Sequence, residues 1–293
     1  MKPVLASVVL LAFGAAGQAA PATVTAGRFS PPFDTTVNDQ ARAYLSATCH
    51  VGLSIVARNG AQVRFFGYGS IVRGYAVKPT PDNVYELASV TKTFTGALAA
   101  KALVEHKMTL DGDFRAYLPG EYPNLILNGK PISLRTLATH TSGLQRDLPD
   151  SEALMAQHDY DRIGYGLAAL DRGFTASRTL AALHAATLRT TPRTTFVYSN
   201  LGIRVIGYGL EHQYRSSFAA LLDSVIFRPL GMHETGFDPT AAMMARLVTP
   251  YNRYGHAQPY HDASGRDLIA RSAELIRHVG GYLRAVRVTG GHA

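Results

Sequence analysis

The chain has 293 residues, of which 46% are hydrophobic and 17% are charged, so it is long enough to bury one large core or two modest ones. This composition excludes a largely disordered chain and a polytopic membrane protein. The net charge of +8 raises the question of a nucleic-acid partner. The basic residues are mostly arginines scattered along the chain, without a dense run or a nucleic-acid motif, so we expect a basic surface and no nucleic acid.

The first residues are typical of an export signal. Met1 and Lys2 precede an apolar run from Val4 to about Ala16, and small residues suited to cleavage follow. The run is short for a membrane span. We therefore predict a signal peptide over residues 1–22, a periplasmic location, and no stable membrane span after cleavage. Cys49 is the single cysteine, so no internal disulfide can form.

Strand signals come next in the chain. After a short helix expected over residues 38–48, two β-prone runs cover residues 51–60 and 61–72. They meet at Asn59-Gly60, and Asn-Gly between such runs is the strongest short hairpin signal.

Helices dominate the rest of the sequence. A helix that begins near Ser89 is apolar on nearly every side up to Glu105, which indicates the centre of a domain. Further helices are predicted within residues 132–144, 151–188, 200–212, 217–232 and 267–286. Strands followed by a run of helices, without linker composition between them, favour one intimate α/β unit interrupted by an all-helical region.

Ser89 and Lys92 form a Ser-x-x-Lys pair in the run "ELASVTKTFTG". Residues three apart share a helix face, so Lys92 lies over the turn that contains Ser89. A serine hydroxyl becomes a strong nucleophile only when a neighbour takes its proton, and a lysine amine can do so when burial lowers its pKa. A polar pair with a capping serine is the alternative interpretation of the same residues.

The run "VYSNLG" supplies the triplet Tyr198, Ser199 and Asn200 at the start of another helix. Ser-x-x-Lys followed by Tyr-x-Asn resembles the serine β-lactamase and penicillin-binding-protein superfamily, in its class C β-lactamase and DD-peptidase branch. "GLSIVARNGAQVRFFGYGSI", "LATHTSGL" and "RPLGMHETGF" are similar to further segments of that family. "NGKPISLRTLATHTSGLQRDLP" resembles its cell-wall DD-carboxypeptidase/endopeptidase members in particular.

The resemblance implies an α+β fold of the β-lactamase/transpeptidase type: an antiparallel sheet flanked by helices, over residues 23–293, with an inserted helical region at about 105–236. Ser89 would attack the carbonyl of a D-alanyl-D-alanine peptide or of a β-lactam, and Lys92 and Tyr198 would share the proton transfers. A free tyrosine has a pKa of about 10, so a base role needs nearby cations. Asn200 would donate its amide to the substrate and hold Lys92. No cofactor or metal is implied.

The third family motif, Lys-Thr-Gly or His-x-Gly, has no clear counterpart. The nearest match is Thr289-Gly290, where Val288 stands in place of a cation. Because the hairpin gives only two clear strands, we expect an incomplete sheet and a chain that is truncated or frame-shifted. Pro192-Arg193 stands where relatives usually carry Pro-Gly.

Three other interpretations stay open. A Ser–His–Asp hydrolase could use His140 and Asp147, although no Gly-x-Ser-x-Gly elbow occurs and His140 is better explained as a structural hydrogen bonder. A metal site at His256 and His261 has no accompanying cysteine or carboxylate cluster in the sequence. The chain could also be a catalytically impaired remnant, a binder of cell-wall peptides, or an esterase of the same family.

Overall fold

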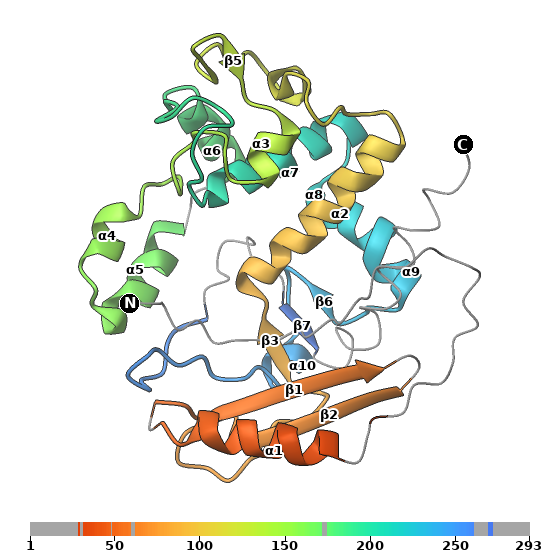
Figure 1. Ribbon diagram of the computed structural model, residues 1–293, viewed down its shortest axis with the longest axis vertical. Helices are drawn as coiled ribbons and strands as arrows, with labels where there is room; N and C mark the ends of the chain where they lie inside the picture. Colours follow the sequence, from red (N-terminus) through yellow and green to blue (C-terminus); the bar gives the residue numbers. More distant parts are fainter. Residues whose placement is uncertain are drawn as a thin grey trace.

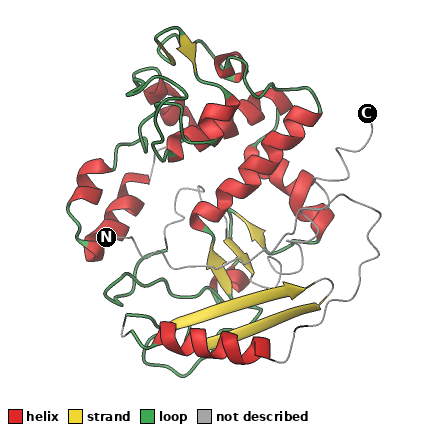
Figure 2. Cartoon of the chain, viewed as in Figure 1, coloured by secondary structure: helices red, strands yellow, loops and turns green. Residues whose placement is uncertain are grey.

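The computed structural model describes residue 29 and residues 32–47, 49–59, 62–171, 175–260 and 269–271. The expected signal peptide, His261 and the segment from Val288 to Ala293 lie outside these residues. The elements are arranged as a β-rich part and a helical part, with one long helix, α2, running from the first into the second (Figures 1 and 2).

The predicted hairpin is present. β1 (Gly52–Asn59) and β2 (Gln62–Gly69) pair antiparallel, in a register that places Asn59 opposite Gln62. Helix α1 (Pro32–Leu45) lies along the hairpin (Figure 1). Tyr68 donates its hydroxyl hydrogen to Asn38 Oδ1 at 2.7 Å, and Arg64 forms an ion pair with Asp34. Polar and charged contacts therefore fasten the helix to the strands.

A second antiparallel sheet joins distant parts of the chain. β3 (Val84–Glu86) and β6 (Thr235–Gly236) both pair with β7 (Ile269–Arg271), which lies between them. The helix predicted over residues 267–286 is therefore wrong at 269–271, and the rest of that segment lies outside the described residues. A run of three residues carries no periodicity, so pairing with two neighbours decides its conformation.

α2 (Thr91–Val104) begins directly after β3 and a short 3-10 turn, η1 (Ala88–Val90) (Figure 1). One side of α2 buries Phe94, Leu98 and Ala102, whereas Val104 is exposed. Only one face of α2 is therefore buried in the core, whereas its apolar sequence predicted burial on nearly every side.

Short helices complete the helical part. Ser133 caps α3 (Leu134–Ala138) with a capping box, in the segment 132–144 where the sequence predicted a helix. The remaining described elements are η2 (Phe114–Tyr117), β4 (Ile126–Leu127), β5 (Lys130–Pro131), α4 (Glu152–Ala156), α5 (Tyr160–Asp171), α6 (Ala176–Leu183), α7 (Asn200–Tyr214), α8 (Phe218–Leu222), the π-helical turn η3 (Asp223–Phe227), α9 (Arg228–Leu230) and α10 (Ala241–Met244).

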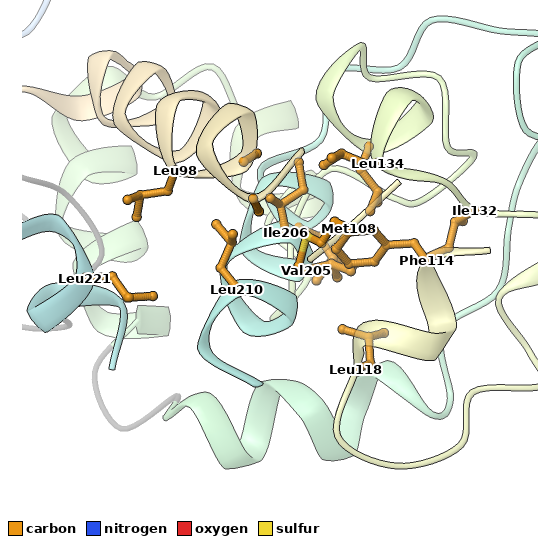
Figure 3. Close-up of a cluster of buried hydrophobic side chains, with 14 of the residues drawn as sticks. Leu98, Met108, Phe114, Leu118, Ile132, Leu134, Val205, Ile206, Leu210 and Leu221 are labelled. Carbon is orange, nitrogen blue, oxygen red and sulfur yellow. The ribbon is translucent and has the colours of Figure 1, made fainter. Parts of the chain in front are cut away.

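The main hydrophobic core lies where α2 and α3 pack against α7. Figure 3 shows its side chains from these helices and from the segment around η2, among them Leu98, Met108, Phe114, Leu134, Ile206 and Leu210. Phe114 is fully buried, and its ring lies directly against Gly209 of α7, where a Cβ atom would come within 2.6 Å of the ring. This packing fixes α7 relative to α2, and the predicted site residues lie at the starts of these two helices.

Candidate active site

Ser89 and Lys92 lie at the junction of η1 and α2. Ser89 is exposed on the 3-10 turn and Lys92 is half-buried in the first turn of α2. Lys92 Nζ donates a hydrogen bond to Ser89 Oγ at 3.0 Å, as the three-residue spacing predicted. The surroundings of Lys92 are less dry than the apolar sequence suggested, since neither side chain is buried.

Tyr198 reaches the same hydroxyl from the start of α7. Ser199 is the N-cap of that helix, since its buried Oγ accepts the Gly202 N–H at 2.9 Å and donates to the Gln145 carbonyl at 2.6 Å. The cap places Tyr198 just outside the helix, where its hydroxyl donates to Ser89 Oγ at 2.8 Å. Two elements far apart in the sequence thus bring a lysine and a tyrosine to one serine oxygen.

His140 is hydrogen-bonded to the backbone on both sides of Tyr198. Its carbonyl accepts the Val197 N–H at 2.8 Å, and its Nδ1 accepts the Ser199 N–H at 3.2 Å. A backbone N–H can only donate, so Nδ1 is unprotonated and the neutral ring carries its hydrogen on Nε2. Partial burial, followed by the Lys92 ammonium, lowers the pKa of His140 below its usual value. The prediction of a structural hydrogen bonder is confirmed.

Two cations lie close to the Tyr198 ring. Lys92 Nζ is 5.1 Å from the ring centroid and Arg146 Cζ is 5.3 Å from it, while the His140 ring centroid is 4.5 Å away. The sequence identified Lys92 as a cation for this tyrosine and did not identify Arg146. A guanidinium or ammonium within about 6 Å of an aromatic centroid is attracted to it. These three groups fix the position of the ring whose hydroxyl touches Ser89.

Asn200 is the first residue of α7, and its amide faces Asp147. Asn200 Nδ2 donates to Asp147 Oδ1 at 2.8 Å. The expectation was a bond to Lys92 and to the substrate, and the observed partner of the amide is a carboxylate that motif reasoning did not assign to the site. The signal for Asp147 is its position three residues after the family segment "THTSGL", which ends at Leu144.

Three residues in or close to the segments that carry Ser89, His140 and Tyr198 have left-handed backbone. The φ angle is 43° at Ala88, 57° at His140 and 75° at Arg193. Such a conformation costs a residue with a Cβ about 1–2 kcal/mol, and strain of this kind is concentrated at functional sites. The glycine that the family resemblance implies at position 193 would adopt this angle without strain. Here the Arg193 N–H bonds to the Thr141 carbonyl at 2.9 Å.

The alternative Ser–His–Asp grouping is not assembled, and the proposed metal pair of His256 and His261 lies only partly within the described residues. His140 Nδ1 is bonded to backbone, and Asp147 contacts Asn200 rather than His140, so these two residues do not form a Ser–His–Asp triad. His256 contacts Asp161 Oδ1 at 2.7 Å, a carboxylate that the sequence did not associate with it. Within the described residues, no three side chains of the metal-binding types come together, and no helix has the length and apolarity of a membrane span.

The comparison with family models decides the affiliation of the chain. The model of the Beta-lactamase family matches residues 37–289. The chain belongs to this family. The affiliation covers the hairpin, both motif-bearing helices and the helical part between them, and it confirms the resemblance to the serine β-lactamase and penicillin-binding-protein superfamily.

Two curated relatives show how far the likeness extends. The chain is 29% identical over 197 residues to D-alanyl-D-alanine-carboxypeptidase/endopeptidase AmpH of Escherichia coli K12, covering 67% of this chain and 48% of AmpH. It is 29% identical over 214 residues to esterase EstB of Burkholderia gladioli, covering 73% of this chain and 53% of EstB. The chain thus spans about half the length of the curated relatives it matches.

Solved structures agree on the fold. A β-lactamase/D-alanine carboxypeptidase from Yersinia pestis superposes with a TM-score of 0.67 at 22% identity, over 83% of this chain and 68% of that one. A class C β-lactamase gives a TM-score of 0.67 at 21% identity, over 86% of this chain and 68% of that one. The expected β-lactamase/transpeptidase-like fold, with helices and short antiparallel sheets, is confirmed.

Proposed function

We propose that this chain is an exported serine hydrolase that forms an acyl-enzyme with D-alanyl-D-alanine peptides of peptidoglycan, with β-lactams, or with both. One observation carries the proposal: Ser89 Oγ is within hydrogen-bond distance of both Lys92 Nζ and Tyr198 Oη, at 3.0 and 2.8 Å. A nucleophile with two groups able to exchange its proton is what acyl transfer through a serine requires.

In the proposed reaction, Ser89 Oγ attacks the substrate carbonyl and its proton passes to Lys92 or Tyr198. Each can accept a proton only in its deprotonated form, the lysine as amine and the tyrosine as phenolate. Tyr198 then protonates the leaving nitrogen as the tetrahedral intermediate collapses to the acyl-enzyme. A water molecule later attacks the ester, and the same two groups take its proton and return one to Ser89. The Ser89 N–H, at the start of the helix, would stabilise the oxyanion.

Peptidoglycan peptide is the substrate that we favour. The segment from Asn128 to Pro149 resembles cell-wall peptidases, and AmpH, a relative at 29% identity, is a D-alanyl-D-alanine-carboxypeptidase/endopeptidase. EstB, at the same identity, is an esterase, which keeps ester hydrolysis as the second candidate. A periplasmic location would place the protein beside its peptide substrate, and the expected signal peptide supports export.

Labelling with a fluorescent penicillin tests the acyl-enzyme. We expect a covalent band with the wild-type chain and none with Ser89→Ala, because the ester can form only on Oγ. Ser46→Ala is the matched control, since Ser46 is an exposed serine whose hydroxyl bonds only to the Ala43 carbonyl among the described residues. A wild-type chain without a band would contradict the proposal and favour an inactive remnant or a peptide binder.

Substrate preference needs a second measurement on the same samples. D-alanine release from a muropeptide, hydrolysis of a chromogenic cephalosporin and hydrolysis of a p-nitrophenyl ester can be compared as kcat/KM values. We expect the muropeptide to give the highest value. A preference for the neutral ester would instead place the chain beside EstB.

A further inference from the structure

The carboxylate of Asp147 determines how Asn200 is presented to the site. Oδ1 of Asp147 lies 2.8 Å from Asn200 Nδ2. A carboxylate can only accept hydrogen bonds, whereas a carboxamide has a donating end and an accepting end. Asn200 must therefore turn its NH₂ group toward Asp147. Its carbonyl oxygen and its second N–H are left for other partners.

Asp147 is itself held firmly by donors on both of its oxygens. Oδ2 accepts from Ser151 Oγ at 3.0 Å and lies 3.4 Å from Arg146 Nε, while Oδ1 lies 3.3 Å from Arg204 Nη2. Its side chain is only 13% exposed. Arg204 also donates to the Leu148 carbonyl at 2.5 Å, so it clamps the backbone beside the carboxylate. Because donors hold both of its oxygens, the Asp147 carboxylate has a fixed position relative to the Asn200 carboxamide.

The location of this network links it to the nucleophile. Asn200 follows Tyr198 by two residues, and the Leu201 N–H bonds to the Arg146 carbonyl at 3.1 Å. Arg146 also lies over the ring of Tyr198. The segment from Gln145 to Asp147 thus contacts every residue of the Tyr-x-Asn triplet, because Ser199 Oγ bonds to the Gln145 carbonyl.

We propose that Asp147 is a positioning residue, which fixes the orientation of the Asn200 carboxamide so that its carbonyl oxygen and one N–H face the acylation site. The consequence for catalysis rests on the proposed function, because it requires that Asn200 meets the substrate or Lys92. The orientation itself does not depend on that function and can be measured in the resting protein.

Side-chain amide NMR tests the orientation. With the Asn200 resonances assigned by their loss in Asn200→Ala, we expect the wild type to show slow exchange of the Asn200 NH₂ with solvent. Asp147→Ala should shift these resonances and accelerate the exchange at least severalfold, because the acceptor is gone. Ser151→Ala is the matched control: it removes a bond to Oδ2 and should leave the Asn200 signals in place. Unchanged Asn200 signals in Asp147→Ala would overturn the proposal whatever the enzyme does.

Acylation kinetics test the consequence. We expect Asp147→Ala to slow acylation by a factor on the order of ten to a hundred, as small misplacements of binding groups do. If Asp147 acts through Asn200, the double variant Asp147→Ala/Asn200→Ala should acylate no more slowly than Asn200→Ala alone. Multiplying effects would show that Asp147 acts independently and would overturn the positioning role.

A folding defect is separated by a second variant. Asp147→Asn keeps the volume of the side chain and removes its charge. We expect it to change the Asn200 amide signals and the acylation rate in the same direction as Asp147→Ala, but by less. Asp113→Asn is the control for loss of a carboxylate, since Asp113 caps η2 and pairs with Arg115. Should the wild type fail to acylate, the proposed function is contradicted, and the NMR comparison still decides the orientation of Asn200.

Discussion

At the residue scale, His140 holds the Tyr198 segment through its carbonyl and its Nδ1. Nδ1 of His140 can accept this hydrogen bond only while it carries no proton. In the folded chain the pKa of the His140 side chain is lowered. Below about pH 6.5, the ordinary value, the unfolded chain binds a proton that the folded chain does not. His140 therefore makes the free energy of unfolding decrease as the pH falls from about 6.5 through the lowered pKa, and it contributes no pH dependence above neutrality.

His140→Asn isolates this contribution. Asparagine tolerates the left-handed backbone at this position, and its Oδ1 can accept the Ser199 N–H without titrating. We expect the stability of the wild type relative to the variant to be constant above about pH 7.5 and to fall below about pH 6.5. Urea unfolding of both chains from pH 5 to pH 8 measures the difference, and parallel curves across the whole range would exclude a role for His140 titration.

The site could be predicted at this scale only as far as its motifs reach. Ser89, Lys92, Tyr198 and Asn200 were found because their spacing repeats a known pattern. Arg146 was not identified, and Asp147 was named only for the alternative Ser–His–Asp grouping, because their contacts to Tyr198 and Asn200 form only when the loop before α4 folds against the start of α7. Charged residues in a loop give no sign in sequence of which distant side chain they meet.

At the element scale, two of the three glycines of α7, Gly207 and Gly209, have different surroundings. A Cβ on Gly209 would lie 2.6 Å from the Phe114 ring, whereas one on Gly207 would meet Phe218 at an ordinary 3.8 Å. Alanine favours a helix over glycine by about 1 kcal/mol. At Gly209 this gain is outweighed by overpacking of about 1–3 kcal/mol, because Phe114 is fully buried.

We therefore expect opposite outcomes in the same helix. Gly209→Ala should lower the midpoint of thermal unfolding, and Gly207→Ala should raise it or leave it unchanged. Differential scanning calorimetry of the two variants beside the wild type gives both shifts. Equal shifts in the two variants would show that helix propensity, and not the Phe114 contact, dominates at these positions.

Elements were predictable where the local sequence determines them. The Asn59-Gly60 signal predicted the hairpin, and the helices predicted within residues 132–144 and 200–212 are present as α3 and α7. The failure was the sheet of β3, β6 and β7, whose strands of two or three residues are too short for any pattern. The conformation of these strands depends on their pairing with one another, and β3 lies far from β6 and β7 in the sequence.

At the scale of the whole molecule, β7 connects the early chain to the end of the helical part. Ala270 is the middle residue of this strand, opposite Tyr85 on β3 and Thr235 on β6. Proline in a strand that has neighbours on both sides removes an N–H donor from the ladder, and for this reason proline is confined to edge strands, strand ends and bulges.

We expect Ala270→Pro to lower the thermal midpoint strongly and to slow acylation, because β3 leads directly to Ser89. Ala270→Gly keeps the N–H and should cost only about 0.5–1 kcal/mol. Thermal unfolding, monitored by circular dichroism, measures the difference in stability between the two variants. A proline variant no less stable than the glycine variant would mean that β7 does not hold the two strands together.

The position of β7 in the strand order also sets a sequence of events during synthesis. Among the described strands β3 pairs only with β7, which is synthesised after residues 246–248, the segment that bonds to Val84, and well after α2 and α7, which can pack earlier. Contacts between such distant segments are also the slowest to form in a free chain. Ser89 follows β3 closely in the sequence, so the sheet that precedes Ser89 is completed only after α2 and α7 are able to pack.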